Sequence, residues 1–301
     1  MTAATIGQIK QQIQQLANEA ASSHLPSFWL TDWLLFVIEQ PSSFLITDEN
    51  HQLTDSELEQ FHAGVTKMQQ GTPLAYLTGQ QEFWSLNFKV NEHTLIPRPD
   101  TEILIEQVLT WINSQPKSVD DNKKPKRLLD LGTGSGCIAI SLAHELNKSN
   151  PNSKAENWQV VAVDLSLEAL KVAKHNAVIN EVADINFIQS SWYDALATQD
   201  EPLFDVIVSN PPYIDEEDEH LARLVAEPIS ALSAPNHGLA DIEHIVQQAP
   251  QNLNVGGLLA IEHGFDQGLA VRQLFSDNRF DSVHTVQDFG GNDRVTLGQL
   301  S

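Results

Sequence analysis

Apolar residues recur at three- and four-residue spacing through roughly the first seventy residues, which is the pattern of helices with one buried face. One such set begins at Ile6 and another runs from Leu30 to Ile38. Thr54, followed three residues later by Glu57, has the form of a capping box, in which each side chain satisfies a backbone N–H at the start of a helix. We therefore expect residues 1–72 to form a small helical domain, and these helices contain no obvious catalytic chemistry.

The hydrophobic period changes to two between residues 82 and 96. Asn91-Glu92-His93 has the composition of a turn, so the segment favours a β-hairpin, and we assign residues 73–96 to a hairpin linker. Pro97 to Glu102 then opens a further helix, since proline and early acidic residues suit a helix N-terminus. The alternating apolar positions of the hairpin are Phe83, Leu86, Phe88 and Val90.

Strand and helix patterns alternate from Arg127 onward, which is typical of a layered α/β domain. We expect this domain to span residues 97–301 and to contain a mostly parallel sheet covered by helices on both faces. The chain shows no internal repeat. The expected strands are Arg127–Leu131, Gln159–Val163, Ile185–Gln189, Phe204–Ser209, Leu258–Glu262, Val283–Gln287 and Arg294–Gly298.

The amino-acid composition limits the classes of function that the protein can have. The 301 residues contain 17 Lys+Arg against 40 Asp+Glu, a formal net charge of −23, which disfavours binding to phosphate backbones. The single cysteine, Cys137, excludes an intrachain disulfide framework and a cysteine-based zinc site, and the histidines show no metal-ligand spacing. No signal peptide or bilayer-length apolar segment is found. We expect an acidic globular protein of the cytoplasm that binds no metal.

Asp130-Leu-Gly132-Thr133-Gly134-Ser135-Gly136 stands directly after an apolar strand and before a helix. Alternate glycines let the backbone turn sharply and approach a ligand closely, and the carboxyl end of a strand in an open α/β sheet is where nucleotides bind. A dinucleotide fingerprint would need glycine where Cys137 stands. The spacing is that of adenosylmethionine-dependent methyltransferases, and the alternative is a glycine-rich turn without a ligand.

Two further residues follow strands of the same unit. Asp164 ends the second strand, where a carboxylate can accept hydrogen bonds from both ribose hydroxyls of an adenosine. A helix cap is the alternative role for Asp164, but Ser166 can serve as that cap. Trp192 follows the third strand, where its ring could stack near adenine. Packing is the alternative role for Trp192.

Asn210-Pro211-Pro212-Tyr213 follows the fourth strand. Two successive prolines fix the backbone and remove two donors, so that carbonyl oxygens remain as acceptors. The Asn side chain adds an acceptor and the Tyr ring a flat platform, a set that suits a planar –NH2 group. Held roughly 3–3.5 Å from a sulfonium methyl, such a weakly nucleophilic nitrogen reaches a near-attack geometry. A simple turn is the alternative.

With these motifs the chain resembles the HemK/PrmC family, the protein-(glutamine-N5) methyltransferases of peptide chain release factors. The resemblance runs from about residue 73 to the end, and the helical N-terminus suits the small N-terminal domain of that family. It implies a Rossmann-like class I methyltransferase fold with a seven-stranded sheet. The matching segments are Pro73–Gly79, Glu82–Trp84, Leu95–Glu102, Asp130–Gly136, Val208–Ile214, Glu227-Pro228, Ala231-Leu232, Glu262–Gly264 and Asp293–Val295.

The resemblance also implies roles for particular residues. Asn210, Pro211, Pro212 and Tyr213 would form the catalytic segment that binds the substrate, which is the glutamine of a Gly-Gly-Gln motif in release factors. We expect the N-terminal domain to dock this partner, the enzyme to act as a monomer, and no residue to serve as a strong general base. The residues implied to contact S-adenosyl-L-methionine are Gly132, Thr133, Gly134, Ser135, Gly136, Asp164, Trp192 and Asn210.

Two other functions compete with this interpretation. Amino-directed methyltransferases that act on adenine N6 in RNA or DNA share the Asn-Pro-Pro-Tyr segment, but the acidic charge and the lack of a Lys/Arg cluster argue against a nucleic-acid substrate. A non-catalytic adenosylmethionine-binding module would not need the amide-binding segment. The chain departs from the family at Asn236-His237-Gly238, where members often have Asp before the Gly, and we expect that loop to tolerate change.

Overall fold

The computed structural model describes residues 4–19, 25–116, 125–148, 158–182, 184–196 and 202–301. The chain divides into two compact units, Met1–Gly79 and Gln80–Ser301. The first unit continues past residue 72 because Leu74 and Leu77, on a short helix, pack against its core. That helix ends at Gly79, whose φ of +69° places it in the left-handed region that commonly terminates helices.

The first unit is helical, as the apolar spacing predicts. Trp33 anchors its core: the indole N–H donates to the Phe61 carbonyl at 3.0 Å, and Gly64 leaves room for the ring. The capping box is confirmed, since Thr54 Oγ1 accepts from the Glu57 N–H at 3.2 Å and Glu57 Oε2 accepts from the Thr54 N–H at 2.7 Å. The helices are α1 (Ile6–Glu19), α2 (Ser27–Ile38), α3 (Phe44–Thr47), α4 (Asp55–Gln69) and α5 (Leu74–Thr78).

The second unit opens with the expected hairpin, formed by β1 (Gln80–Phe83) and β2 (Leu86–Lys89). The turn lies at Trp84 and Ser85, whose φ angles of 55° and 57° match a two-residue type I′ turn. The expected turn at Asn91-Glu92-His93 is present, since the Thr94 N–H donates to the Asn91 carbonyl at 3.0 Å, but it follows β2 and does not connect the two strands of the hairpin. Trp84 and Ser85 lack the usual Asn-Gly signal. Instead, the Trp84 N–H donates to Glu102 at 2.8 Å and its indole N–H to Glu145 at 3.1 Å.

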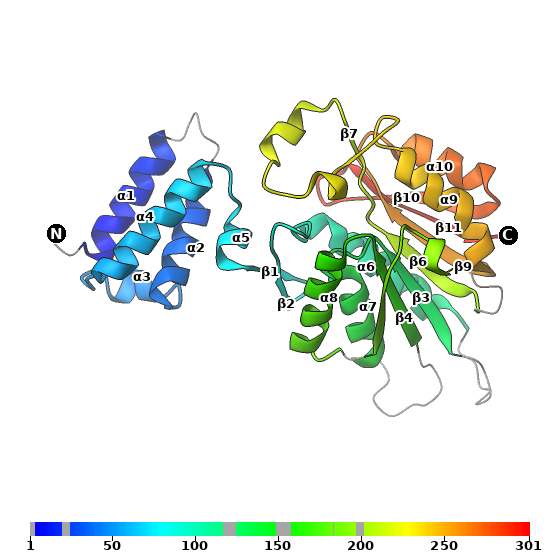
Figure 1. Ribbon diagram of the computed structural model, residues 1–301, viewed down its shortest axis with the longest axis horizontal. Coiled ribbons are helices and arrows are strands. Elements are labelled where there is room, and N and C mark those ends of the chain that lie inside the picture. The colour runs from blue at the N-terminus through cyan, green and yellow to red at the C-terminus, as the bar shows by residue number, and fades with distance from the viewer. Residues whose placement is uncertain (1–3, 20–24, 117–124, 149–157, 183, 197–201) are drawn as a thin grey trace. The chain divides into compact units, whose positions relative to one another are not determined.

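A seven-stranded sheet forms the centre of this unit, in the order β10-β11-β9-β6-β3-β4-β5 (Figure 1). All seven expected strands are confirmed. Neighbouring strands from β9 to β5 run parallel, and β11 is antiparallel to both β9 and β10. The strands are β3 (Lys126–Leu131), β4 (Trp158–Asp164), β5 (Ile185–Gln189), β6 (Phe204–Ser209), β9 (Leu253–Glu262), β10 (Phe280–Gln287) and β11 (Asp293–Leu300).

Helices cover both faces of the sheet, as expected. Leu128 and Leu129 on β3 enter different hydrophobic cores, which explains why this central strand is rich in apolar residues. Figure 1 shows α6 (Glu102–Ser114), α7 (Cys137–Lys148) and α8 (Leu167–Ile179) on one side, with α9 (Ala240–Asn252) and α10 (Gly268–Asp277) on the other.

Short elements surround the carboxyl ends of the strands. They are η2 (Pro99–Thr101), η3 (Asp194–Leu196), η4 (Glu219–Arg223) and η5 (Ile229–Ala231), with the parallel pair β7 (Ile214–Asp215) and β8 (Ser233–Ala234). Within the described ranges, no helix has the length and apolar character needed to cross a membrane.

Candidate active site

The glycine loop connects the end of β3 to the start of α7. A Cβ added at Gly136, where φ is +84°, would lie 2.8 Å from Ile140 Cδ1 and 3.1 Å from Ala173 Cβ, so this glycine permits close packing against α8. Gly134, where φ is +55°, has nothing within 4 Å of such a Cβ. Gly134 therefore borders open space and Gly136 does not.

Asp164, at the end of β4, holds the glycine loop in place. Its Oδ2 accepts from the Gly134 N–H and its Oδ1 from the Ser166 N–H, both at 2.8 Å. Burial raises the pKa of this carboxyl against the opposing effect of the two hydrogen bonds. Ser166 is the N-cap of α8, as predicted, and accepts from the Ala169 N–H at 3.2 Å. Each oxygen of Asp164 keeps a further lone pair for a ligand.

Asp130, the first residue of the loop motif, is fully buried. Its Oδ2 accepts from Thr133 Oγ1 at 2.6 Å and from the Ala139 N–H at 3.2 Å, while its Oδ1 has no partner in the described part of the chain. Burial raises the pKa of Asp130 to about 7.

One cavity of about 290 Å³ brings most of the expected cofactor residues together: Gly132, Gly134, Asp164, Trp192 and Asn210 all line it. Thr133, Ser135 and Gly136 do not line this cavity, although they belong to the same loop. Trp192 lies over the loop, with its ring 3.4 Å from where a Gly132 Cβ would be. The other lining residues are His93, Leu95, Leu165, Ser166, Ala169, Ser190, Ser191, Pro212, Pro228, Ser230, Ala231 and Asp241.

The Asn-Pro-Pro-Tyr segment leaves β6 beside this cavity. Asn210 and Pro212 line the cavity, whereas Pro211 is buried. The Asn210 Nδ2 donates to Thr101 Oγ1 at 3.2 Å. The Tyr213 hydroxyl lies 3.4 Å from Glu262 Oε1, and burial raises the pKa of Tyr213. The sequence-predicted loop and amide-binding segment therefore open onto one space.

Acidic residues that sequence reasoning left without a role surround this segment. Glu262 ends β9 with 1% of its surface exposed, and burial raises its pKa to about 7. Arg294 lies 2.9 Å from Asp288 and 3.8 Å from Asp100. Like Asp164, Glu262 is an acidic residue at the carboxyl end of a strand. This position is the sequence signal that could have identified Glu262 as a candidate site residue.

The loop at Asn236-His237-Gly238 is more constrained than expected. A Cβ at Gly238, where φ is +76°, would lie 1.9 Å from the carbonyl oxygen of Tyr213. Gln267 Nε2 donates to the carbonyls of Tyr213 at 2.9 Å and of His237 at 3.0 Å. The expectation that this loop tolerates change is therefore wrong at Gly238, because the glycine packs directly against the backbone of the Asn-Pro-Pro-Tyr segment.

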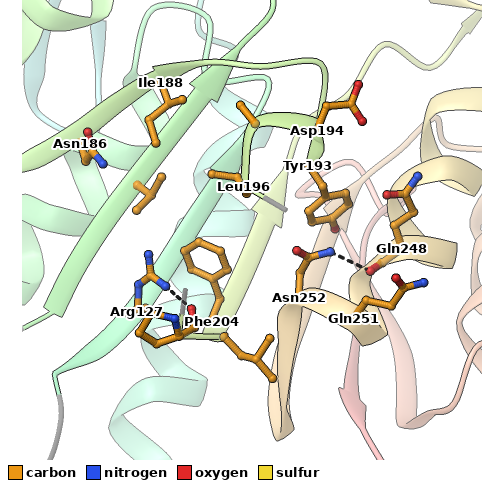
Figure 2. A pocket seen from close by; sticks show the side chains of 14 residues that line it. Arg127, Asn186, Ile188, Tyr193, Asp194, Leu196, Phe204, Gln248, Gln251 and Asn252 are labelled. Carbon is orange, nitrogen blue, oxygen red and sulfur yellow. Dashed lines mark hydrogen bonds between the residues drawn. The ribbon is translucent and has the colours of Figure 1, made fainter. Parts of the chain in front are cut away.

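A larger cavity, of about 420 Å³, lies elsewhere in the unit. Figure 2 shows the amide side chains of Gln248, Gln251 and Asn252 on α9 across from Asn186 and Ile188 on β5. This cavity shares no lining residue with the one described above and includes neither the glycine loop nor the Asn-Pro-Pro-Tyr segment. Its lining gives no basis for methyl transfer.

The chain is similar to known proteins along its whole length. A family model described as the PrmC N-terminal domain matches residues 8–79, and one described as a methyltransferase domain matches residues 122–288. The chain is 41% identical over 293 residues to the release factor glutamine methyltransferase of Aliivibrio fischeri, covering 97% of this chain and 95% of that protein. It is 44% identical to the Escherichia coli enzyme of the same name, covering 85% and 86% respectively.

Solved structures support the fold. A 16S rRNA methyltransferase from Thermus thermophilus, solved with AdoMet and guanosine, aligns with a TM-score of 0.50 over 74% of this chain and 50% of that chain, at 16% identity. Identity this low supports the class I methyltransferase fold alone, and the sheet order and the family matches agree with it. The chain belongs to the family of release factor glutamine methyltransferases.

Proposed function

We propose that this protein transfers a methyl group from S-adenosyl-L-methionine to the side-chain amide nitrogen, N5, of the glutamine in the Gly-Gly-Gln motif of peptide chain release factors. One observation carries the proposal: Gly134 and Asp164 line the same cavity as Asn210 and Pro212. A methyl donor bound by Gly134 and Asp164 and an amide bound by Asn210 and Pro212 would therefore lie in the same cavity. The names of the relatives supply the substrate.

The chain's residues fit the cofactor. Asp164 has lone pairs for two ribose hydroxyls, Gly134 admits a close approach, and Trp192 offers a flat surface for adenine. Asp130 Oδ1 is a buried acceptor without a donor near the same loop. When bound, S-adenosyl-L-methionine supplies an electrophilic methyl on a sulfonium, so the acceptor nitrogen needs positioning more than activation.

Asn210 and the two prolines orient the acceptor amide. The side-chain Oδ1 of Asn210 and backbone carbonyls of the segment accept the two hydrogens of the substrate –NH2, which directs its nitrogen at the methyl group. The rigid proline backbone keeps these acceptors in place without paying ordering entropy when the substrate binds. The alkylated amide nitrogen carries a positive charge, so its proton becomes acidic and passes to water, and we assign no strong general base.

The alternative, methylation of adenine N6 in RNA or DNA, is not favoured. The relatives described above at 41% and 44% identity are release factor enzymes. The net charge of −23 also opposes a phosphate-bearing substrate.

We further propose that the first unit docks the release factor, that one chain suffices for catalysis, and that the enzyme acts in the cytoplasm. The cavity residues all come from the second unit, which leaves the first unit free for recognition. Release factors are translation proteins, which supports the cytoplasmic location.

The direct test is incubation with labelled S-adenosyl-L-methionine and, separately, purified release factor, tRNA, rRNA and duplex DNA. We expect label on the release factor and none when its Gly-Gly-Gln glutamine is replaced by alanine. Label on nucleic acid without label on the release factor would overturn the proposal.

Replacing Asn210 by alanine tests the amide-binding role. We expect Asn210→Ala to lower methyl transfer by about 100-fold or more, because the amide loses a positioned acceptor. S-adenosyl-L-methionine affinity, measured by calorimetry, should change by no more than about threefold. An equal loss of affinity and transfer would place Asn210 in cofactor binding or folding instead.

A further inference from the structure

We propose that Arg98 and Glu227 form a clasp that joins two walls of the 290 Å³ cavity, and that tight binding of S-adenosyl-L-methionine depends on this clasp. The inference rests on the proposed function, because it takes that cavity as the place where the cofactor binds. Neither Arg98 nor Glu227 lines the cavity. They are therefore positioning residues, which act through the residues beside them.

The clasp consists of two hydrogen bonds to one carboxylate. Glu227 Oε1 accepts from Arg98 Nη2, and Glu227 Oε2 accepts from the Ile96 N–H at 3.1 Å. The two donors belong to one short segment that lies 129 and 131 positions before Glu227 in the chain. Because both oxygens are held, the contact fixes the orientation of the carboxylate as well as its distance.

The two partners differ in their exposure to solvent. The Glu227 side chain is 2% exposed, whereas the Arg98 side chain is 36% exposed. A buried carboxylate is costly unless it is paired, so Glu227 depends on Arg98. Arg98 depends less on Glu227, because water reaches the guanidinium. Removal of Arg98 should therefore do more harm than neutralisation of Glu227.

The backbone around Arg98 is stiff because Pro97 and Pro99 flank it. Proline fixes its own φ and restricts the residue before it to extended conformations. Arg98 is accordingly extended, with φ of −101° and ψ of 141°. Few backbone conformations are lost when this residue pairs with Glu227, so the clasp forms at a low cost in entropy.

Cavity-lining residues adjoin both halves of the clasp in the sequence. One of them directly precedes Ile96, and the others follow Glu227 within four positions. The clasp therefore holds two walls of the cavity at a fixed separation, although the walls come from distant parts of the chain. These lining residues are Leu95, Pro228, Ser230 and Ala231.

The wall that follows Glu227 is also connected to the Asn-Pro-Pro-Tyr segment. The Ala231 N–H donates to the Pro228 carbonyl at 2.9 Å, which closes the single turn of η5. The Ile214 N–H donates to the Leu232 carbonyl at 2.9 Å, and Ile214 directly follows Tyr213. Loss of the clasp would thus loosen the wall beside the cofactor and the support of the segment that we propose to bind the amide.

The first test is calorimetric titration of S-adenosyl-L-methionine into Arg98→Met, which removes the charge and keeps a long side chain. We expect the Kd to rise by about tenfold or more, because only molecules whose walls are in place bind the cofactor. Arg98→Lys keeps the charge and should stay within about threefold of wild type. An unchanged Kd in Arg98→Met, or equal losses in both variants, would overturn the inference.

Arg272 provides a matched control outside the cavity. Its Nη1 lies 3.3 Å from Asp293 Oδ2, and its side chain is 34% exposed, close to the value for Arg98. Neither Arg272 nor Asp293 lines the cavity. Arg272→Met should leave the Kd within about twofold of wild type, since this pair adjoins no cavity wall. A rise as large as that in Arg98→Met would make general destabilisation the cause and contradict the clasp.

The second test is a double-mutant cycle on the pair. Glu227→Gln removes the charge but keeps an oxygen for the Ile96 N–H, so we expect the Kd to rise by about three- to tenfold. Adding Glu227→Gln to Arg98→Met should recover at least about threefold of the lost affinity, because it removes the unpaired buried charge. Equal affinity in Arg98→Met and the double variant would refute the pairing. If Arg98→Met fails to fold, a wild-type Kd in Glu227→Gln is the result that overturns the clasp.

The clasp and the proposed function would fail on different observations. If the wild-type enzyme binds S-adenosyl-L-methionine but leaves the release factor unmethylated, the proposed function is wrong, and the calorimetric titrations still decide whether the clasp exists. If the wild-type enzyme methylates the release factor and Arg98→Met binds the cofactor as tightly as wild type, the clasp alone is wrong.

Discussion

Gly134 and Gly136 lie two positions apart in one loop, yet the molecule needs them for different reasons. Both have positive φ angles, which cost other residues about 1–2 kcal/mol. At Gly136 a side chain would also collide with Ile140 and Ala173, whereas at Gly134 it would enter open space. One glycine serves the packing of the fold, and the other borders the open space in which we propose that the cofactor binds.

This difference predicts separable defects. Gly136→Ala should lower the free energy of unfolding by about 3 kcal/mol, combining backbone strain with overpacking. Gly134→Ala should lower it by about 1 kcal/mol but weaken S-adenosyl-L-methionine binding by at least about tenfold, because the methyl group occupies the approach to the loop. Urea unfolding and calorimetric titration of both variants measure the two effects. Equal unfolding losses in the two variants would contradict this account.

At the scale of elements, one buried side chain joins three segments. Asn176 on α8 is 0% exposed. Its Oδ1 accepts from the Lys89 N–H at 2.7 Å, and its Nδ2 donates to the carbonyls of Lys89 at 3.0 Å and Ser135 at 2.8 Å. These hydrogen bonds fix the positions of the hairpin, the glycine loop and α8 relative to one another.

Removing this side chain leaves buried backbone groups without partners. Asn176→Ala should therefore lower the free energy of unfolding by about 3 kcal/mol, as measured by urea titration. Asn180→Ala, at the C-cap of the same helix, is the matched control: Asn180 also donates to the hairpin, to the Asn87 carbonyl at 2.9 Å, but this hydrogen bond is exposed to solvent. We expect that variant to lose less than about 1 kcal/mol. Similar losses in both variants would show that burial is not the cause.

For the whole molecule, the central fact is that the two units have separate cores. The core of the first unit draws on all five helices from α1 to α5, and both cores of the second unit draw on residues after Gly79. The catalytic unit should therefore fold without its N-terminal neighbour, so that folding and recognition can be tested apart.

Deletion of residues 1–79 tests the docking proposal. We expect the remaining unit to unfold cooperatively and to bind S-adenosyl-L-methionine with unchanged affinity, because the cavity lies entirely within it. KM for the release factor should rise by about tenfold or more as docking contacts are lost. A folded deletion variant with unchanged KM would rule out docking by the first unit.

The amino-acid sequence by itself determined the features that depend on nearby residues. Apolar runs marked central strands such as β3 and β6, because these strands are buried on both faces, and Thr54 with Glu57 marked a helix start. The glycine loop and the Asn-Pro-Pro-Tyr segment could be recognised from the sequence because each is a short run of residues whose types and spacing define its chemistry.

The tertiary structure decided what depends on distant residues. The hairpin turn falls at Trp84 and Ser85 because Glu102 and Glu145 hold Trp84 there, and no local signal records those contacts. Asn210 reaches Thr101, and Tyr213 reaches Glu262, only because separate segments converge at the carboxyl ends of the strands. A hydrogen bond needs atoms about 3 Å apart, and only folding brings residues so far apart in the chain to that distance.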